Sequence, residues 1–312
     1  GVTGGALMIL GEDYGEGSSI LQERTHAFAT KSQMWLLDPR PDLETIVHMV
    51  EKGFELSEAS NTPVMLELRI RACHVHGAFE ASDNKAGLHN RNQVIEEPSH
   101  DFGRITLPPS TYEQEKHKIN VRMPEAIRFI RENQLNDHFD GDIDDVGIIC
   151  QGGLYNATLR ALVQAGLADA SGNSRIPILA LNVTYPLVAD EISDFCAGKS
   201  AILMVEEGQP DYLEEAINVI LRKADLQTKV IGKGPLPMAG EYTAEVVLRG
   251  LAAFLDQTQP NGVDVKEATA PVRDLDQHKA RAAKLLGELL PARPPTFCTG
   301  CPERPLFSAI RI

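Results

Sequence analysis

The sequence has no excess of positive charge. Its 312 residues include 30 Lys and Arg against 44 Asp and Glu, which gives a formal net charge of −14. Proteins that bind nucleic acid or an anionic membrane surface present a cationic patch to these partners. We therefore expect no nucleic acid and no membrane among the partners of this chain.

Long apolar runs are missing as well. No stretch reaches the roughly 18 apolar residues that a membrane-spanning helix needs, and the first residues do not have the pattern of a signal peptide. The five cysteines are an odd number and are scattered along the chain, which does not fit a disulfide framework. These absences predict a protein of the reducing cytoplasm.

Two common nucleotide-binding motifs are also absent. Neither the G-x-G-x-x-G fingerprint nor a P-loop occurs, and no internal repeat is apparent. The turn Gln151-Gly152-Gly153 falls between a predicted strand and a predicted helix, where backbone N–H groups could hold an anion. A glycine turn that lets the helix pack closely on the strand is the favoured interpretation.

What the sequence does contain is an alternation of short apolar strands and amphipathic helices. In the first region we predict a buried strand at 4–10, strands at 35–37 and 63–71, and a helix that Asp42 caps. In strand 63–71 the side chains alternate, so Leu66, Leu68 and Ile70 would face a core and Glu67, Arg69 and Arg71 a cleft or solvent. This pattern predicts a parallel or mixed α/β sheet.

The second region is more regular. Strands are predicted at 146–150, 177–183, 201–207 and 229–232, with helices between them, which indicates an open sheet with right-handed crossovers. Glu206 and Glu207 end the third of these strands. Because neighbouring side chains on a strand point to opposite faces, we favour a structural or interface role for them over a paired acid and base.

The residues predict two α/β units. The first ends near Arg71, and a long irregular connection follows at 72–110. In the helical linker at 106–142 we predict a helix at 112–134 that Pro124 kinks or divides into two helices. After the second unit we predict a linker at 256–271 and a helix at 274–290.

Cys298 and Cys301 stand at C-x-x-C spacing between prolines. Two intervening residues let a tight turn direct both sulfurs at one metal ion or cluster. Pro302 follows the second cysteine directly, which suits iron–sulfur proteins better than zinc fingers; two unbonded thiols or a redox pair are the alternatives. Since no second cysteine pair follows, we expect the chain to be the middle of a larger protein.

Two further polar groups are candidates for binding. Glu12, Asp13, Ser18 and Ser19 follow the first strand, where capping and turn formation explain most of their occurrence and contact with a ligand is the alternative. His74 and His76 would lie on one face of an extended segment, but the sequence places no third metal ligand beside them.

Taken in order, several of these pieces resemble one family, the alpha subunit of indolepyruvate:ferredoxin oxidoreductase. The segments that carry the resemblance are Gly4-Gly5-Ala6-Leu7, Glu12-Asp13, Ser18-Ser19, Phe54-Glu55-Leu56-Ser57-Glu58, Pro63-Val64-Met65-Leu66, Arg71 with His74, Gly152-Gly153-Leu154-Tyr155-Asn156, Tyr185-Pro186-Leu187, Val205-Glu206-Glu207, Gly240-Glu241 and Cys298-Thr299-Gly300-Cys301-Pro302. They span essentially the whole chain.

The resemblance implies a fold. The segment 1–105 would be part of a pyrimidine-type (PYR) domain of thiamine enzymes, and 143–258 a domain like the transketolase C-terminal domain, with an open parallel or mixed sheet. The segment 259–312 would hold the start of the diphosphate-binding (PP) domain with its C-x-G-C motif.

It also implies an activity. Such enzymes oxidatively decarboxylate an aryl 2-oxo acid such as indolepyruvate, with thiamine diphosphate and Mg²⁺, and pass electrons through 4Fe-4S clusters to ferredoxin and the acyl group to coenzyme A. Thiamine supplies the nucleophile and electron sink. The partners would be a beta subunit or a fused gamma-type domain, in an oligomer. The alternative class is a non-catalytic α/β protein for assembly or partner binding that has lost the cofactor machinery; a zinc-stabilised α/β domain is a weaker third.

The site residues follow from the same resemblance. Glu12, Asp13, Ser18 and Ser19 would contact the cofactor, Cys298 and Cys301 would be metal ligands, and Arg69, Arg71 and His74 would steer an anionic substrate or hold an interface. The Glu that activates thiamine is expected upstream of Gly1, so no catalytic residue is predicted here and the chain alone should be inactive. Glu303 replaces the family's usual His, and the loop at Glu12 departs from its usual Asp-Asp-Pro-Gly, which leaves the particular 2-oxo acid open.

Overall fold

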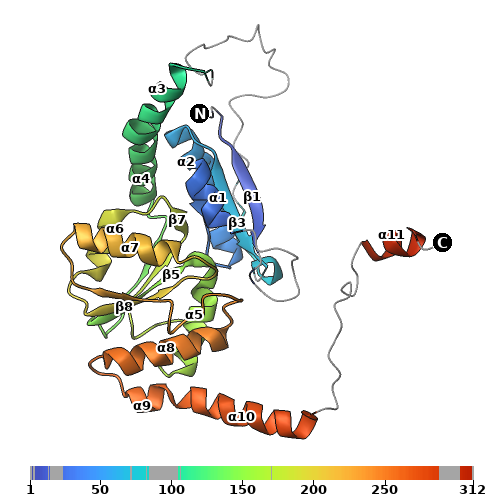
Figure 1. Ribbon diagram of the computed structural model, residues 1–312, viewed down its shortest axis with the longest axis vertical. Helices are drawn as coiled ribbons and strands as arrows, with labels where there is room; N and C mark the ends of the chain where they lie inside the picture. Colours follow the sequence, from blue (N-terminus) through green and yellow to red (C-terminus); the bar gives the residue numbers. More distant parts are fainter. Residues whose placement is uncertain are drawn as a thin grey trace.

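The computed structural model of the chain describes most of its residues as two α/β units joined by a helical segment (Figure 1). The described residues are Val2, 4–12, Tyr14, 24–70, 72–81, Asp83, Ile105, 107–169, 171–287 and 303–310. Six of the predicted site residues lie outside this part: Asp13, Ser18, Ser19, Arg71, Cys298 and Cys301. The predicted α/β class is confirmed by both sheets.

The first sheet has the strand order β1-β3-β2-β7. Strands β1 (Leu7–Glu12) and β2 (Trp35–Leu37) both pair in parallel with β3 (Val64–Arg69). The fourth strand, β7 (Val183–Tyr185), runs antiparallel to β2. The sheet therefore contains one strand that comes from the predicted second domain.

Two helices cover this sheet, α1 (Thr25–Ser32) and α2 (Leu43–Ser60). The predicted cap of α2 is confirmed, because the Asp42 carboxylate accepts a hydrogen bond of 2.8 Å from the Thr45 N–H. Trp35 is fully buried beneath α2, and its indole N–H donates to the Ser60 hydroxyl at 2.7 Å. The apolar stripe of α2 and the strands thus form one core.

Strand β1 differs from its prediction. We expected a buried strand, but β1 lies at the edge of the sheet, and Met8 and Ile9 are 47% and 60% exposed. Neighbouring β3 is buried along nearly its whole length, so Glu67 and Arg69, predicted to face a cleft or solvent, are buried instead.

A helical segment links the two units. It comprises the short 3₁₀ turn η1 (Ala72–His74), α3 (Ser110–His117), the π-helical turn η3 (Lys118–Arg122) and α4 (Met123–Glu132). The break predicted near Pro124 is present, because α3 and α4 are separate helices with this π turn between them. Pro124 lies in the first turn of α4, directly after the π turn, and it has no N–H to donate to a carbonyl of that turn.

The second sheet has the strand order β4-β6-β5-β8-β9. Its strands are β4 (Asp137–Phe139), β5 (Val146–Gln151), β6 (Ile178–Leu181), β8 (Ala201–Val205) and β9 (Lys229–Ile231). All pairs are parallel except β4 with β6, which is antiparallel. Strand β4 falls within the predicted linker.

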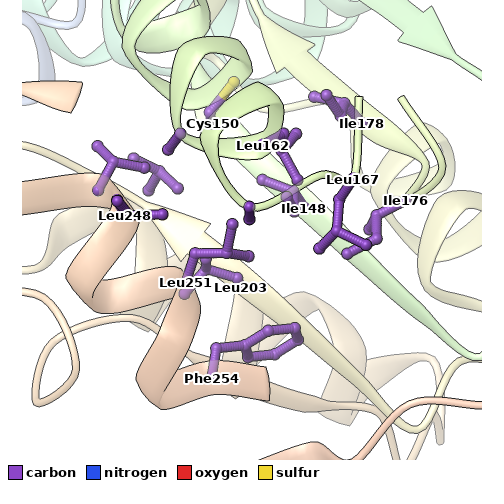
Figure 2. Packing of buried hydrophobic residues seen from close by; sticks show 14 of the residues in the cluster. Ile148, Cys150, Leu162, Leu167, Ile176, Ile178, Leu203, Leu248, Leu251 and Phe254 are labelled. Carbon is purple, nitrogen blue, oxygen red and sulfur yellow. The ribbon is translucent and has the colours of Figure 1, made fainter. Parts of the chain in front are cut away.

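Helices cover both faces of the second sheet. On one face lie α5 (Tyr155–Gln164), preceded by the 3₁₀ turn η4 (Gly152–Leu154), and α8 (Ala244–Thr258); on the other lie α6 (Ala189–Cys196) and α7 (Tyr212–Lys223). Figure 2 shows the first of these cores, where Leu248, Leu251 and Phe254 of α8 pack against Ile148 and Leu203 of the sheet. Apolar strands covered on both faces are typical of parallel sheets.

Three more helices follow: α9 (Val265–Ala268), α10 (Ala270–Leu286) and α11 (Glu303–Ile310). Helix α10 corresponds to the helix predicted at 274–290 and begins four residues earlier, at Ala270. Within the described ranges, no helix has both the length and the apolar character needed to cross a bilayer.

The prediction of one strand at 177–183 was wrong. The segment divides at Asn182, so β6 joins the second sheet and β7 the first. Asn182 interrupts the strand because its side chain donates to the Leu135 carbonyl at 2.9 Å and accepts from the Arg40 N–H at 2.9 Å. Its own backbone carbonyl accepts from the Asp38 N–H at 2.8 Å. These bonds turn the chain from one sheet into the other.

Candidate functional site

Polar side chains from both units meet where parallel strands of the two sheets end. In open α/β sheets, the crevice beyond the carboxyl ends of the strands is the usual place for ligands. We refer to this group as the carboxylate cluster, and its members, all buried, are Glu12, Tyr14, Asp38, Glu67, Arg69 and Glu207.

Arg69 lies at the centre of the carboxylate cluster. Its guanidinium contacts Asp38 with two hydrogen bonds, Nε to Oδ1 at 3.2 Å and Nη2 to Oδ2 at 2.7 Å. A third hydrogen bond runs from Nη1 to Glu207 Oε2, and Nη2 lies 3.3 Å from Glu67 Oε1. Planar guanidinium and carboxylate groups match in this two-pronged geometry. Arg69 is 5% exposed, so these contacts are screened little by water.

The charges in the cluster do not balance. Four carboxyl groups surround one guanidinium, and burial makes an uncompensated charge costly. Burial, and next the negative charge of Asp38, raise the pKa of Glu67 well above its ordinary value. Glu67 Oε1 accepts no hydrogen bond, which also fits a carboxyl group whose pKa lies above its ordinary value.

The pKa of the Arg69 guanidinium is raised as well, which favours its charged form. Burial alone lowers the pKa of this guanidinium, but the attraction of Asp38, Glu67 and Glu207 outweighs it and raises the pKa well above its usual value. The ring of Tyr14 lies 5.3 Å from the guanidinium carbon and closes one side of the group. Burial raises the pKa of the Tyr14 phenol as well, so its hydroxyl keeps its proton.

The Glu12 carboxylate is hydrogen-bonded to Thr25, the first residue of α1. Its Oε2 accepts hydrogen bonds from the N–H of Thr25 at 2.8 Å and from the Thr25 hydroxyl at 2.7 Å. A carboxylate at this position satisfies backbone donors that the first turn of a helix leaves unpaired. Contact of Glu12 with a cofactor remains a prediction, as it does for Asp13, Ser18 and Ser19, which lie outside the described residues.

The Gly152-Gly153 turn packs against the cluster. A Cβ on Gly153 would lie 2.4 Å from Arg69 Nε, and one on Gly152 would lie 2.1 Å from the Asp38 carbonyl oxygen. The Gly153 N–H donates to Asp38 Oδ1 at 3.2 Å. The two glycines thus allow Asp38 and Arg69 of the first unit to approach the turn closely, whereas close packing of the helix on its strand stays a prediction. The anion at this turn is a carboxylate of the protein itself.

Glu206 and Glu207 have separate partners. This was predicted, because neighbouring side chains on a strand point to opposite faces. The Glu206 carboxylate accepts from the N–H groups of Leu213 and Glu214, at 2.9 and 3.0 Å, and so caps α7. Burial raises the pKa of Glu206 to about 7. Glu207 instead pairs with Arg69, and the two carboxylates do not form an acid/base pair.

The remaining predicted residues are not brought to the cluster. His74 lies exposed on η1, and Arg71 lies outside the described residues. Arg69 connects the two units through Glu207, whereas its contact with a substrate remains a prediction. Asp38 and Tyr14 were not predicted as site residues. For Asp38, its position directly after the strand at 35–37 was a signal that it lies at the carboxyl edge of the sheet.

Metal binding was predicted for Cys298 and Cys301, which are outside the described part of the chain. Of the cysteines that the structure describes, Cys73 is exposed, while Cys150 and Cys196 are buried and burial raises the pKa of each thiol to about 12. In the same part of the chain no three His, Cys, Asp or Glu side chains are placed to hold a metal ion. The ligand role of Cys298 and Cys301 stays a prediction.

The carboxylate cluster does not fit thiamine diphosphate with Mg²⁺. A diphosphate needs cationic groups or free N–H donors, but the one guanidinium here is already bonded to Asp38 and Glu207 and the Gly153 N–H to Asp38. The surplus of carboxyl groups repels further negative charge. Groups that hold the phosphates would have to come from outside this cluster.

Comparison with known proteins shows what the chain resembles. The sequence profile of the indolepyruvate ferredoxin oxidoreductase middle domain matches residues 136–241. This part of the chain is therefore similar to that middle domain.

The whole chain is similar to part of one subunit of indolepyruvate oxidoreductases. It is 27% identical to the indolepyruvate oxidoreductase subunit IorA of Methanothermobacter thermautotrophicus, and 26% identical to the IorA subunits of Pyrococcus abyssi and Archaeoglobus fulgidus. Each match covers 100% of this chain and 45% of the relative. The resemblance found in the sequence is confirmed, and the chain spans less than half the length of these relatives.

Two solved structures are weakly similar. One is the 2-oxoglutarate:ferredoxin oxidoreductase from Magnetococcus marinus with 2-oxoglutarate, coenzyme A and succinyl-CoA bound, at 14% identity and TM-score 0.48, with 78% of this chain and 48% of that chain covered. The other is a split-gene transketolase, an inactive beta4 tetramer, at 14% identity and TM-score 0.38, with 86% and 66% covered. Neither score reaches 0.5, so these likenesses carry no argument about fold or activity.

Proposed function

We propose that the chain is part of the alpha subunit of a 2-oxo acid:ferredoxin oxidoreductase. The complete enzyme would decarboxylate an aryl 2-oxo acid, indolepyruvate or a similar compound, transfer the acyl group to coenzyme A and pass the electrons to ferredoxin. The observation that carries this proposal is the similarity to IorA subunits over all of the chain.

The cofactors of the proposal are thiamine diphosphate, Mg²⁺ and 4Fe-4S clusters. Thiamine supplies a carbon nucleophile and an electron sink, which decarboxylation of a 2-oxo acid needs. Since the carboxylate cluster does not fit the diphosphate, we assign these groups mainly to parts of the enzyme beyond the described residues. Glu12, Asp13, Ser18 and Ser19 would line the entrance to the cofactor, and Cys298 with Cys301 would bind iron or begin the next domain.

In this proposal the chain contributes to three domains. The segment 1–105 would be part of the pyrimidine-type domain, 143–258 the transketolase-like domain, and 259–312 the start of the diphosphate-binding domain. The carboxylate cluster would hold the first two in one orientation, because Arg69 of β3 bonds to Glu207 beyond β8. A fixed orientation matters for an active site assembled from several domains.

The proposed partners are a beta subunit or a fused gamma-type domain, ferredoxin, coenzyme A and the 2-oxo acid, in an oligomer of the cytoplasm. Reduction of a viologen dye, measured under anaerobic conditions, tests the proposal. We expect reduction that depends on indolepyruvate, coenzyme A and thiamine diphosphate from the complete alpha subunit with its partner subunit, and none from residues 1–312 alone.

One observation favours a second candidate. The carboxylate cluster is closed and bonded to itself, as expected for a non-catalytic protein that keeps the two domains for assembly. If the complete subunit binds its partner but reduces no dye with any aryl 2-oxo acid, the catalytic proposal is wrong and the assembly role replaces it.

A further inference from the structure

Two carboxyl groups compete for one guanidinium at the junction between the two units. Glu67 belongs to β3 of the first unit, Glu207 follows β8 of the second unit, and both lie beside Arg69. Glu207 Oε2 accepts a hydrogen bond from Arg69 Nη1, whereas Glu67 Oε1 lies 3.3 Å from Arg69 Nη2 and accepts none. In this closed arrangement the carboxylate from across the junction therefore makes the better contact with the cation.

Glu67 is left without a full counter-charge in a place that water does not reach. Its side chain is 2% exposed, and the negative charges of Asp38, Glu12 and Glu207 all disfavour its ionised form. A buried carboxylate beside others of the same charge is costly, and a bound proton removes this cost. The raised pKa of Glu67 follows from these surroundings.

Separation of the two units at this point would reverse the competition. Glu207 would leave with the second unit, because its Oε1 accepts from the Tyr242 N–H there. Arg69 Nη1 would then be free to bond to Glu67, whose side chain lies on the same face of β3 two residues away. Water would also enter and remove the desolvation that contributes most to the raised pKa of Glu67. Both changes favour the ionised form of Glu67.

We propose that closing of the junction between the two units is linked to the binding of a proton by Glu67. While Glu67 holds the proton, Arg69 pairs with Glu207 and the units are closed; when Glu67 loses it, Glu67 pairs with Arg69 in place of Glu207 and the units open. The pH of the surroundings would thereby set the fraction of molecules in which the two units have their closed orientation.

Other titratable groups at the junction also affect its response to pH. Those that face Glu67 are Asp38 after β2, Glu12 and Tyr14 at the end of β1, Arg69 on β3 and Glu207 after β8. Farther away, His26 of α1 stacks on Tyr212 of α7. The pKa of His26 is lowered by burial, so this contact is weakened in acid, with a sign opposite to that of Glu67. A test must separate the two effects.

Hydrogen exchange at single amides tests the inference without any need for activity, so its result does not depend on the proposed function. The Gly153 N–H donates to Asp38 Oδ1 across the junction at 3.2 Å, so its protection from exchange reports the closed state. The Ile148 N–H donates to the Pro177 carbonyl inside the second unit and reports larger unfolding. If the junction opens by itself, Gly153 should be less protected than Ile148.

Glu67→Gln is the matched variant, because the amide has nearly the same shape and carries no charge at any pH. The ratio of Gly153 protection in the native protein to that in the variant should be constant below pH 4.5, the ordinary pKa of Glu67. Above this pH the ratio should fall by up to about tenfold per pH unit, until the pH reaches the pKa of Glu67 in the closed protein. His26 is present in both proteins, so its effect cancels in the ratio.

Glu214→Gln is the control. Burial raises the pKa of Glu214 as well, but its carboxylate accepts from the Lys233 N–H inside the second unit. The same ratio, measured against this variant, should not change with pH.

Two results would overturn the inference. If Gly153 exchanges as slowly as Ile148, the junction opens only when the protein unfolds. If the ratio for Glu67→Gln is independent of pH, the proton is not linked to the junction. Should this variant not fold, NMR of carbon-13-labelled glutamate gives the titration midpoint of Glu67 in His26→Phe. The loss of Gly153 protection in that protein must end at the same pH, and a mismatch also contradicts the inference.

Discussion

Arg69 of β3 and Glu207 of the segment after β8 form a buried ion pair that joins the two sheets of the protein. The two residues are far apart in the sequence and neither is exposed to solvent. Because Asp38 binds the same guanidinium, one cation holds carboxylates from both units. The stability of the junction between the units should therefore depend on this one side chain.

Removing the cation should destabilise the fold. Arg69→Met leaves Asp38 and Glu207 buried without their counter-charge, which costs about 3–5 kcal/mol of the free energy of unfolding. Urea unfolding at pH 7, followed by circular dichroism, measures the loss. The control is Arg128→Met, because Arg128 pairs with Glu125 and Glu132 on the exposed face of α4 and should contribute little. Similar losses for both variants would show that the buried pair is not special.

Glu67 should behave as a group whose proton is retained on folding. Its pKa is raised in the folded protein, so its contribution to stability is complete below the unfolded pKa of 4.5 and is lost as the pH rises towards the folded pKa. Glu67→Gln carries no such loss. The variant should match the native protein near pH 4 and become more stable than it by about 1.4 kcal/mol per pH unit above that. A variant that is less stable at pH 7 would show that the ionised carboxylate is needed.

His26 should make the protein sensitive to acid. Its ring stacks on Tyr212 at 5.3 Å, and burial lowers its pKa from 6.5 to about 4. A depressed pKa gives stability that is present above pH 6.5 and lost as the pH falls to 4, up to about 3 kcal/mol in total. His26→Phe keeps the ring stack and removes this dependence. Unfolding measured from pH 7 to pH 4 for this variant, and for the exposed control His278→Phe, distinguishes the site from a general acid effect.

The turn before α5 should not accept a side chain. In Gly153→Ala the new Cβ would lie 2.4 Å from Arg69 Nε, and the side chain it meets is locked by its ion pairs. We expect a loss of roughly 1–3 kcal/mol from overpacking. Gly11→Ala serves as the control, since its Cβ would have no neighbour within 4 Å. Equal thermal midpoints for the two variants would mean that Arg69 can move aside.

Metal content tests the cysteine pair. If Cys298 and Cys301 bind an iron–sulfur cluster, the anaerobically purified complete subunit should contain acid-labile sulfide, and Cys298→Ser with Cys301→Ser should reduce both iron and sulfide. Zinc in place of iron and sulfide would support a structural zinc site. Cys73→Ser, at an exposed cysteine far from the pair in sequence, is the control.

Local patterns predicted much of the fold. The cap of Asp42, the strand at 35–37 and the alternating elements of the second unit depend on neighbouring residues and were correctly predicted. The split at Asn182 was not, because it depends on bonds to Leu135 and Arg40, distant in the sequence. For the same reason, the sequence predicts a linker where strand β4 lies, because the pairing of β4 with β6 is a long-range contact.

The candidate site was predicted in part. Alternation placed Glu67 and Arg69 on one face of a strand, but only the neighbouring unit makes that face a buried one. Nothing near Arg69 in sequence reveals that Glu207 is its partner. Asp38 could have been included, since it directly follows a predicted strand at the carboxyl edge of the sheet.

Strand β7 crosses the boundary between the two units. Although β7 belongs to the segment 136–241 in sequence, it pairs with β2 of the first sheet. A chimera that replaces residues 136–241 with the equivalent domain of a relative would thus also exchange one strand of the adjoining sheet. The two units can therefore be inherited or engineered separately only if Leu36 and Leu37 accept the incoming strand, so sequence change on either side of this contact should be constrained by the other.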